Sequence, residues 1–118
     1  MKVQRCNEQE SGSAWERVDS TFRVFLYRGE GPFATEAHDV SDATLTETLA
    51  WAEKNAGNER LFAIALVSED AYGETGLTWL VGIDANRSPH DTVERRLFNE
   101  LYRQTNGSMA EHGRRVRQ

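Results

Sequence analysis

Cysteine is almost absent from this chain: its 118 residues include one, Cys6, which cannot form an internal disulfide. Disulfide frameworks are typical of small secreted domains, so this lack argues against secretion. The longest apolar run, residues 61–67, is far shorter than the ~18 residues of a membrane helix, and no signal-peptide core follows Met1. We therefore expect a cytoplasmic protein that does not enter a membrane.

Basic side chains are scarce in most of the sequence. Residues 1–86 hold seven Lys and Arg against fifteen Asp and Glu, a net charge of −8. Residues 87–118 hold seven Arg against four acids, a net charge of +3, and the whole chain carries −5. The acidic body would repel nucleic acid, while the basic end could contact an acidic partner.

Catalytic and metal-binding motifs are also missing. The glycine-rich segment 29–32 has no P-loop lysine, and no nucleophile elbow occurs. His38-Asp39 and His90-Asp91 are adjacent pairs that could hold a metal or a small ligand, but both stand beside expected helix starts, where Asp is common. The sequence thus predicts no metal, no cofactor and no catalytic residue. It favours a non-enzymatic protein, with an enzyme or ligand binder using the His/Asp pairs as the alternative.

What the sequence does contain is a regular series of apolar segments. Alternating or continuous apolar residues predict strands at 21–28, 33–40, 61–67 and 77–83. Helical spacing predicts one helix capped by Ser41 and ending at Gly57, and another capped by Ser88 and ending at Gly107. Glu94 falls within the apolar arc of the second helix, where we expect it to reach solvent or an arginine.

The element order predicts an α+β fold: a two-layer sandwich with a four-stranded antiparallel sheet and both helices on one face (ββαββα). Residues 15–107 would form the single domain, with Ile64, Leu66, Trp79 and Val81 fully buried. Residues 1–14 would be a disordered N-terminal segment, and residues 108–118 a basic flexible tail.

Four segments, RVFLYRG, LAWAEKNAG, LFAIALV and GLTWLVGID, resemble parts of small actinobacterial proteins that have this element order. The resemblance covers residues 21–84 and rests on core positions. It implies the same element order and a bacterial source, and it implies no activity.

The second face of the predicted sheet is the first functional hypothesis. Residues 61–67 are all apolar, so this strand has no polar side to present to water. An uncovered apolar face typically marks an interface, and a homodimer would be the simplest cover, with the segment around Trp15 as an intramolecular rival. The predicted interface residues are Phe25, Tyr27, Leu61, Ala63, Ala65, Val67 and Leu80. The first hypothesis is therefore a small protein-interaction or regulatory module that self-associates through that face.

The second hypothesis is contact with nucleic acid or another acidic partner through the arginines of the second helix and the tail. The residues concerned are Arg95, Arg96, Arg103, Arg114, Arg115 and Arg117. No aromatic residues alternate with these arginines, which weakens the nucleic-acid interpretation.

Overall fold

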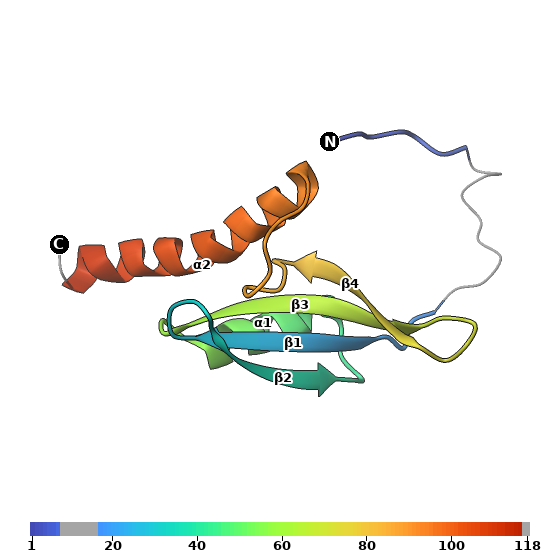
Figure 1. Ribbon diagram of the computed structural model, residues 1–118, viewed down its shortest axis with the longest axis horizontal. Helices are drawn as coiled ribbons and strands as arrows, with labels where there is room; N and C mark the ends of the chain where they lie inside the picture. Colours follow the sequence, from blue (N-terminus) through green and yellow to red (C-terminus); the bar gives the residue numbers. More distant parts are fainter. Residues whose placement is uncertain (8–16, 117–118) are drawn as a thin grey trace.

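The structure is a computed structural model that describes residues 1–7 and 17–116, with side chains described as far as Gln104. Its elements in chain order are β1 (Thr21–Arg28), β2 (Ala34–Val40), α1 (Leu45–Ala56), β3 (Arg60–Glu69), β4 (Thr75–Val81) and α2 (Thr92–Val116) (Figure 1). The ββαββα order and the single antiparallel sheet confirm the predicted α+β class. Trp15 and Arg117 lie outside the described residues, as do the side chains of Arg114 and Arg115.

The sheet has the strand order β2-β1-β3-β4, and every pairing is antiparallel. β1 and β2 are joined by the five residues 29–33, and β3 and β4 by the five residues 70–74. In the second of these turns the Asp70 carboxylate accepts hydrogen bonds from the backbone N–H groups of Tyr72 and Glu74. The two hairpins meet along β1 and β3, which are the central strands.

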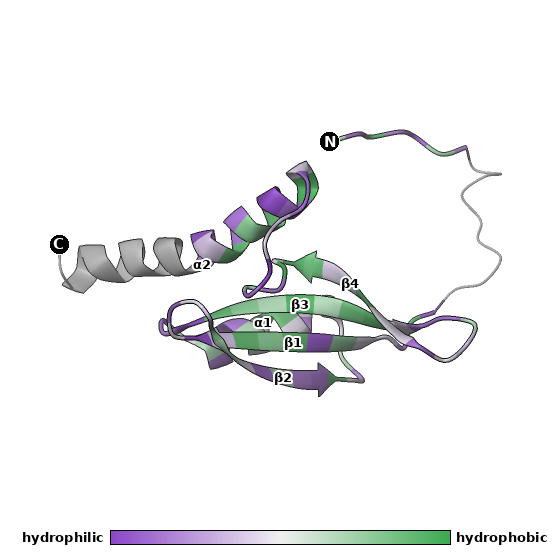
Figure 2. Cartoon of the chain, in the orientation of Figure 1, coloured by the Kyte–Doolittle hydropathy of each residue, from purple (hydrophilic) through white to green (hydrophobic). Residues whose placement is uncertain are grey.

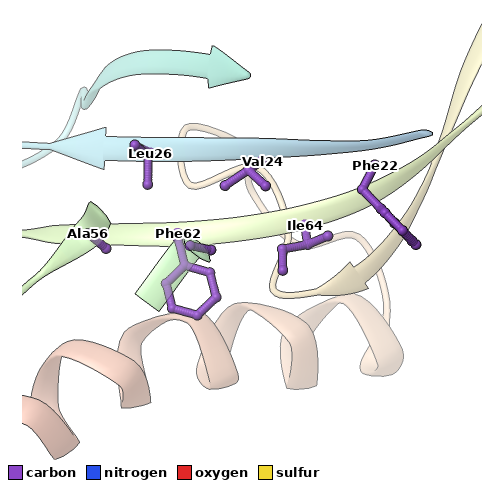
Figure 3. Packing of buried hydrophobic residues seen from close by; sticks show 7 residues of the cluster. Phe22, Val24, Leu26, Ala56, Phe62 and Ile64 are labelled. Atoms are coloured by element: carbon purple, nitrogen blue, oxygen red, sulfur yellow. The ribbon is translucent and has the colours of Figure 1, made fainter. Parts of the chain in front are cut away.

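Each face of the sheet has its own hydrophobic core, because alternate residues of a strand point to opposite faces. On one face Phe22, Val24 and Leu26 of β1 pack with Phe62 and Ile64 of β3 and with Ala52 and Ala56 of α1 (Figure 3). On the other face Tyr27 of β1 and Leu61 and Ala63 of β3 pack with Leu101 of α2. The helices therefore cover opposite faces, and the predicted placement of both on one face was wrong.

The two connections explain this difference. Residues 41–44 join β2 to α1, and after this four-residue link α1 packs on the face that carries Val24 and Ile64. Residues 82–91 join β4 to α2, and these ten residues are long enough to carry the chain to the other face. Gly82 begins this connection with φ +67°, a conformation that favours glycine.

Both helix starts lie three residues later than predicted. Thr44, not Ser41, caps α1: it forms a capping box with Glu47, in which each side chain bonds the backbone N–H of the other residue. Asp91, not Ser88, accepts the N–H of Glu94 at 2.8 Å before α2. Gly57 ends α1 as predicted, but α2 continues beyond Gly107 to Val116.

A β-bulge in β4 divides its apolar residues between the two faces. Ile64 pairs with Val81 and Ala65 with Trp79, so Leu80 is the extra residue. As a result Val81 packs in the α1 core and Trp79 in the α2 core. We expected Ile64, Leu66, Trp79 and Val81 all to be fully buried; Ile64 is, and the other three are partly buried.

α2 is held on β3 where β4 no longer pairs with it. The backbone N–H of Phe62 donates to Gln104 Oε1 of α2 at 3.2 Å, so the helix supplies an acceptor in place of a neighbouring strand. Gly82 permits the close approach: a Cβ there would lie 3.3 Å from Leu101 Cδ1 and 3.4 Å from Ala63 Cβ. From this contact α2 extends beyond the end of the sheet (Figure 1). Among the described residues, no helix is both long enough and apolar enough to cross a membrane.

Candidate functional site

The α2 face carries a series of neighbouring aromatic side chains, here called the aromatic row. Its neighbouring ring centroids are 4.9–6.4 Å apart, within the range of favourable aromatic pairs. It runs from β4 across β1 and the β1–β2 loop to α2, in the order Trp79, Phe25, Tyr27, Phe33, Tyr102, Phe98. The row joins β1 and the loop that follows it to β4 and α2, which are distant from them in sequence.

Tyr27 lies in the middle of the row and is almost completely buried. Its hydroxyl has no hydrogen-bond partner within the described part of the chain. Burial, and secondarily the negative charge of Asp84, raises the pKa of Tyr27, while the backbone amide of Ala85 acts in the opposite direction. The phenol is therefore neutral at physiological pH and is unsuited to act as a base.

Phe33 is fixed in the row by a distant asparagine. Asn86, in the β4–α2 connection, accepts the N–H of Phe33 at 2.7 Å and donates to its carbonyl oxygen at 3.1 Å. The same amide donates to Thr35 Oγ1 at 3.3 Å. Asn86 thus ties the β1–β2 loop to the segment that leads into α2.

A pocket of about 300 Å³ opens beside the aromatic row, between the β1–β2 loop, the start of β3 and α2. Aromatic and apolar side chains, two carboxylates and two loop glycines line it: Tyr27, Phe33, Tyr102, Leu61, Glu30, Glu59, Gly29 and Gly31. None of these is a Lys, Arg or His. We call it the aromatic–acidic pocket.

Sequence reasoning missed this pocket. It considered residues 29–32 only as a glycine-rich segment without a P-loop lysine and gave no functional role to Glu30, Glu59 or Phe33. The available signal was the continuous apolar run of β3, which required a cover on both faces. A second helix on the far face would have brought Tyr102 over Leu61 and Tyr27.

The predicted interface residues divide into two groups. Tyr27, Leu61, Ala63 and Ala65 are buried within one chain. The other three stay partly accessible or exposed: Phe25, Val67 and Leu80. An interface on this side of the sheet would use this second group, toward β4.

β4 and the start of α2 are among the places where apolar side chains are exposed, together with Tyr72 of the β3–β4 turn and Leu45 and Trp51 of α1. Leu77 and Leu80 of β4 are 38% and 37% exposed, and Val93 in the first turn of α2 is 59% exposed. Further along the helix Leu97 and Phe98 are half-buried and Leu101 is 0% exposed. Hence the apolar side of α2 meets the sheet near Leu101 and is progressively more open toward its N-terminal end.

The two edge strands differ in charge. β2 presents Glu36, His38 and Asp39, and Figure 2 shows it as largely hydrophilic, with β3 largely hydrophobic. Arg23 bonds Asp39 through Nε at 2.7 Å, which lowers the pKa of Asp39, and His38 contacts the Trp51 ring of α1. β4 has the sequence TGLTWLV and contains no charged residue. Among the described strands it pairs only with β3, so its outer edge carries no such protection.

Arg95, Arg96 and Arg103 are exposed on α2, where the second hypothesis requires them. Glu94 instead pairs with Arg87, its Oε2 lying 2.7 Å from Arg87 Nη2, which confirms the expected arginine partner. Its other oxygen accepts the backbone N–H of His90 at 3.0 Å.

The His/Asp pairs have separate local partners. His38 bonds Glu36 and Asp39 pairs with Arg23, whereas Asp91 caps α2 and His90 is exposed at the surface. Over the described residues, no group of three or more His, Cys, Asp or Glu side chains is arranged to hold a metal ion.

Comparisons of the chain with protein-family models, with curated proteins and with solved structures find no match. The resemblance to small actinobacterial proteins therefore stays a prediction, and the function must be argued from the geometry alone.

Proposed function

We propose that this protein is a small non-enzymatic interaction module that associates with a second copy of itself. The contact would run along β4, by antiparallel pairing of the β4 strands of two copies around a two-fold axis. The observation that carries the proposal is the contrast between a charged edge strand, β2, and an uncharged edge strand, β4, with two exposed leucines. Unprotected edges of this kind are templates for pairing with another strand.

A second copy suits this edge better than an unrelated partner. An isologous contact needs only one surface that complements itself, and β4 offers an uncharged edge with four apolar side chains among its seven residues. Antiparallel pairing also separates the acidic β3–β4 turns, which contain Asp70 and Glu74, to opposite ends of the contact. The partly accessible Val67 of β3, which pairs with Leu77, would then lie one strand inward from the new junction.

Solution mass measured by light scattering tests the proposal. The wild-type protein should approach twice its chain mass of 13.4 kDa as concentration rises. Leu77→Lys with Leu80→Lys should give a folded monomer, because both side chains are exposed and charge at a paired edge opposes association. Leu45→Lys is the matched control: Leu45 is 41% exposed on α1, away from β4, and this variant should associate like the wild type. A wild-type mass that stays at 13.4 kDa at every concentration would refute self-association.

The exposed arginines favour a second function, contact with an acidic partner through the outer side of α2. Arg95, Arg96 and Arg103 have no ion pair with any described residue, so their charge is available. Binding of a nucleic acid or an acidic peptide should weaken steeply with salt and should be lost in Arg96→Glu with Arg103→Glu. Binding of neither ligand at low salt would exclude this function.

A further inference from the structure

The residues that line the aromatic–acidic pocket include two carboxylates and no cation. In the described chain Glu30 and Glu59 form no ion pair or hydrogen bond, whereas Glu36, Asp39 and Glu94 are each paired with arginine. Two carboxylates at one small opening, without a cation among the lining residues, raise the local concentration of positively charged solutes.

The walls of the pocket select the kind of cation. Phe33 and Tyr102 are partly accessible and supply aromatic rings at its side, while the almost completely buried Tyr27 and Leu61 close its base. Aromatic faces attract ammonium and guanidinium groups through the ring quadrupole, and apolar walls favour a carbon stem over a fully hydrated metal ion. A hard divalent cation would require several converging oxygen ligands, and the described residues hold no group of three carboxylates or histidines.

The size of the pocket restricts the ligand further. About 300 Å³ is at the small end of ligand-binding pockets, which suits a single alkyl group with a charged head and is small for a nucleotide or a folded partner. The glycines at 29 and 31 leave the loop rim without side chains, so the entrance stays open beside Glu30.

We infer that the aromatic–acidic pocket binds an organic cation with a guanidinium or ammonium head on an apolar stem. The head group lies against Glu30 and Glu59, and the stem contacts Leu61 and the rings of Phe33 and Tyr102. Such a group occurs both in free amines and in arginine or lysine side chains. The inference does not depend on self-association, because every lining residue comes from one chain.

Titration of the whole protein with n-butylguanidinium and n-butylammonium, followed by backbone amide NMR, tests the site. The amide signals of Gly29, Gly31 and Leu61 should shift in a saturable manner. The neutral isostere n-butylurea should bind more weakly, since it keeps the stem and loses the charge. Equal binding of n-butylurea, or shifts confined to the α1 side of the sheet, would overturn the inference.

Charge removal at the pocket supplies the matched comparison. Glu30→Gln with Glu59→Gln should weaken n-butylguanidinium binding about two- to tenfold, as expected when exposed charge pairs are lost. Glu53→Gln with Glu74→Gln removes the same charge at exposed positions outside the pocket and should leave the affinity unchanged. An equal loss in both double variants would mean that only net charge is sensed, which contradicts a specific site.

Two further measurements ask whether the cation is a free amine or a peptide side chain, and whether binding depends on self-association. N-acetylarginine amide should compete with n-butylguanidinium if the pocket accepts peptide side chains, and its failure to compete would limit the site to free amines. Leu77→Lys with Leu80→Lys should bind n-butylguanidinium as the wild type does. Loss of binding in that variant would overturn a site made by one chain, whatever the outcome for self-association.

Discussion

The two faces of the sheet are covered in different ways. α1 closes its face with small residues, Ala52 and Ala56, that let the helix lie close over Val24 and Ile64, and these four side chains are almost fully buried. α2 crosses the other face over an aromatic row and makes its closest contact near Leu101, leaving Trp79 and Tyr102 partly accessible. Because the α1 core is closed and the α2 core is partly open, we expect a truncation to cost more on the α1 face.

The largest expected effect is on the α1 face. Ile64→Ala should lower the free energy of unfolding by about 2–5 kcal/mol, because Ile64 is 0% exposed and is enclosed by α1 and its strand neighbours. Chemical denaturation measures this loss. A loss below about 0.5 kcal/mol, typical of surface positions, would show that β3 is not the centre of this core.

On the α2 face the equivalent truncation should cost less. Leu101→Ala removes a side chain that is also 0% exposed, but the surrounding layer is partly open and can relax or admit water. We expect a loss of about 2–3 kcal/mol, in the lower part of the range for such truncations. A loss larger than that of Ile64→Ala, in the same denaturation experiment, would reverse the comparison of the two faces.

One methyl group added at Gly82, where the chain turns toward α2, should lower the stability of the protein. Gly82→Ala places a Cβ 3.3 Å from Leu101 Cδ1 at φ +67°, and left-handed backbone costs an L-residue about 1–2 kcal/mol. Thermal unfolding should show a loss of at least that size. Gly76→Ala is the control, since Gly76 has no positive φ and nothing within 4 Å of its Cβ position. A Gly82→Ala variant as stable as Gly76→Ala would mean that α2 is not held closely against the sheet.

The smallest effect on the free energy of unfolding is expected for the Arg23–Asp39 ion pair, which joins β1 and β2. The bond with Arg23 lowers the pKa of Asp39 in the folded protein. Its stabilisation is therefore present above the ordinary Asp pKa and is lost as pH falls through the lowered value. Because the pair lies at the surface, with side chains 30% and 51% exposed, a double-mutant cycle with Arg23→Gln and Asp39→Asn should give at most about 1 kcal/mol at neutral pH. A coupling that grows as the solution is acidified would contradict this assignment.

The strands were predictable because their signals are local. β1 was predicted with its observed bounds, since the alternation of Phe22, Val24 and Leu26 with polar or aromatic neighbours admits no other register. Both helix caps were misplaced by three residues, since Ser41 and Ser88 compete in sequence with Thr44 and Asp91, and only the side-chain bonds to Glu47 and Glu94 decide between them.

The face of α2 was not predictable from alternation alone. Residues 61–67 correctly indicated that β3 is covered on both sides, but the sequence does not state by what. The position of α2 on this face depends on the bulge at Leu80 and on the turn at Gly82. Each of these features involves a single residue, which a pattern of apolar alternation does not reveal. The pocket was missed for the same reason, because it exists only once Tyr102 lies beside Phe33 and Leu61.

The central position of β1 and β3 has a consequence for how the chain folds. Each hairpin closes a loop of five residues, so each can form early and alone at small entropic cost. The pairs between β1 and β3 join residues from 32 apart, Arg28 and Arg60, to 46 apart, Thr21 and Val67. Contacts so far apart in sequence slow the search for the native state.

We therefore expect the encounter of the two hairpins to limit the folding rate, and not the formation of either helix. Variants in the middle of β1 and β3 should then slow refolding, while variants at Thr44 or Asp91 should mainly speed unfolding.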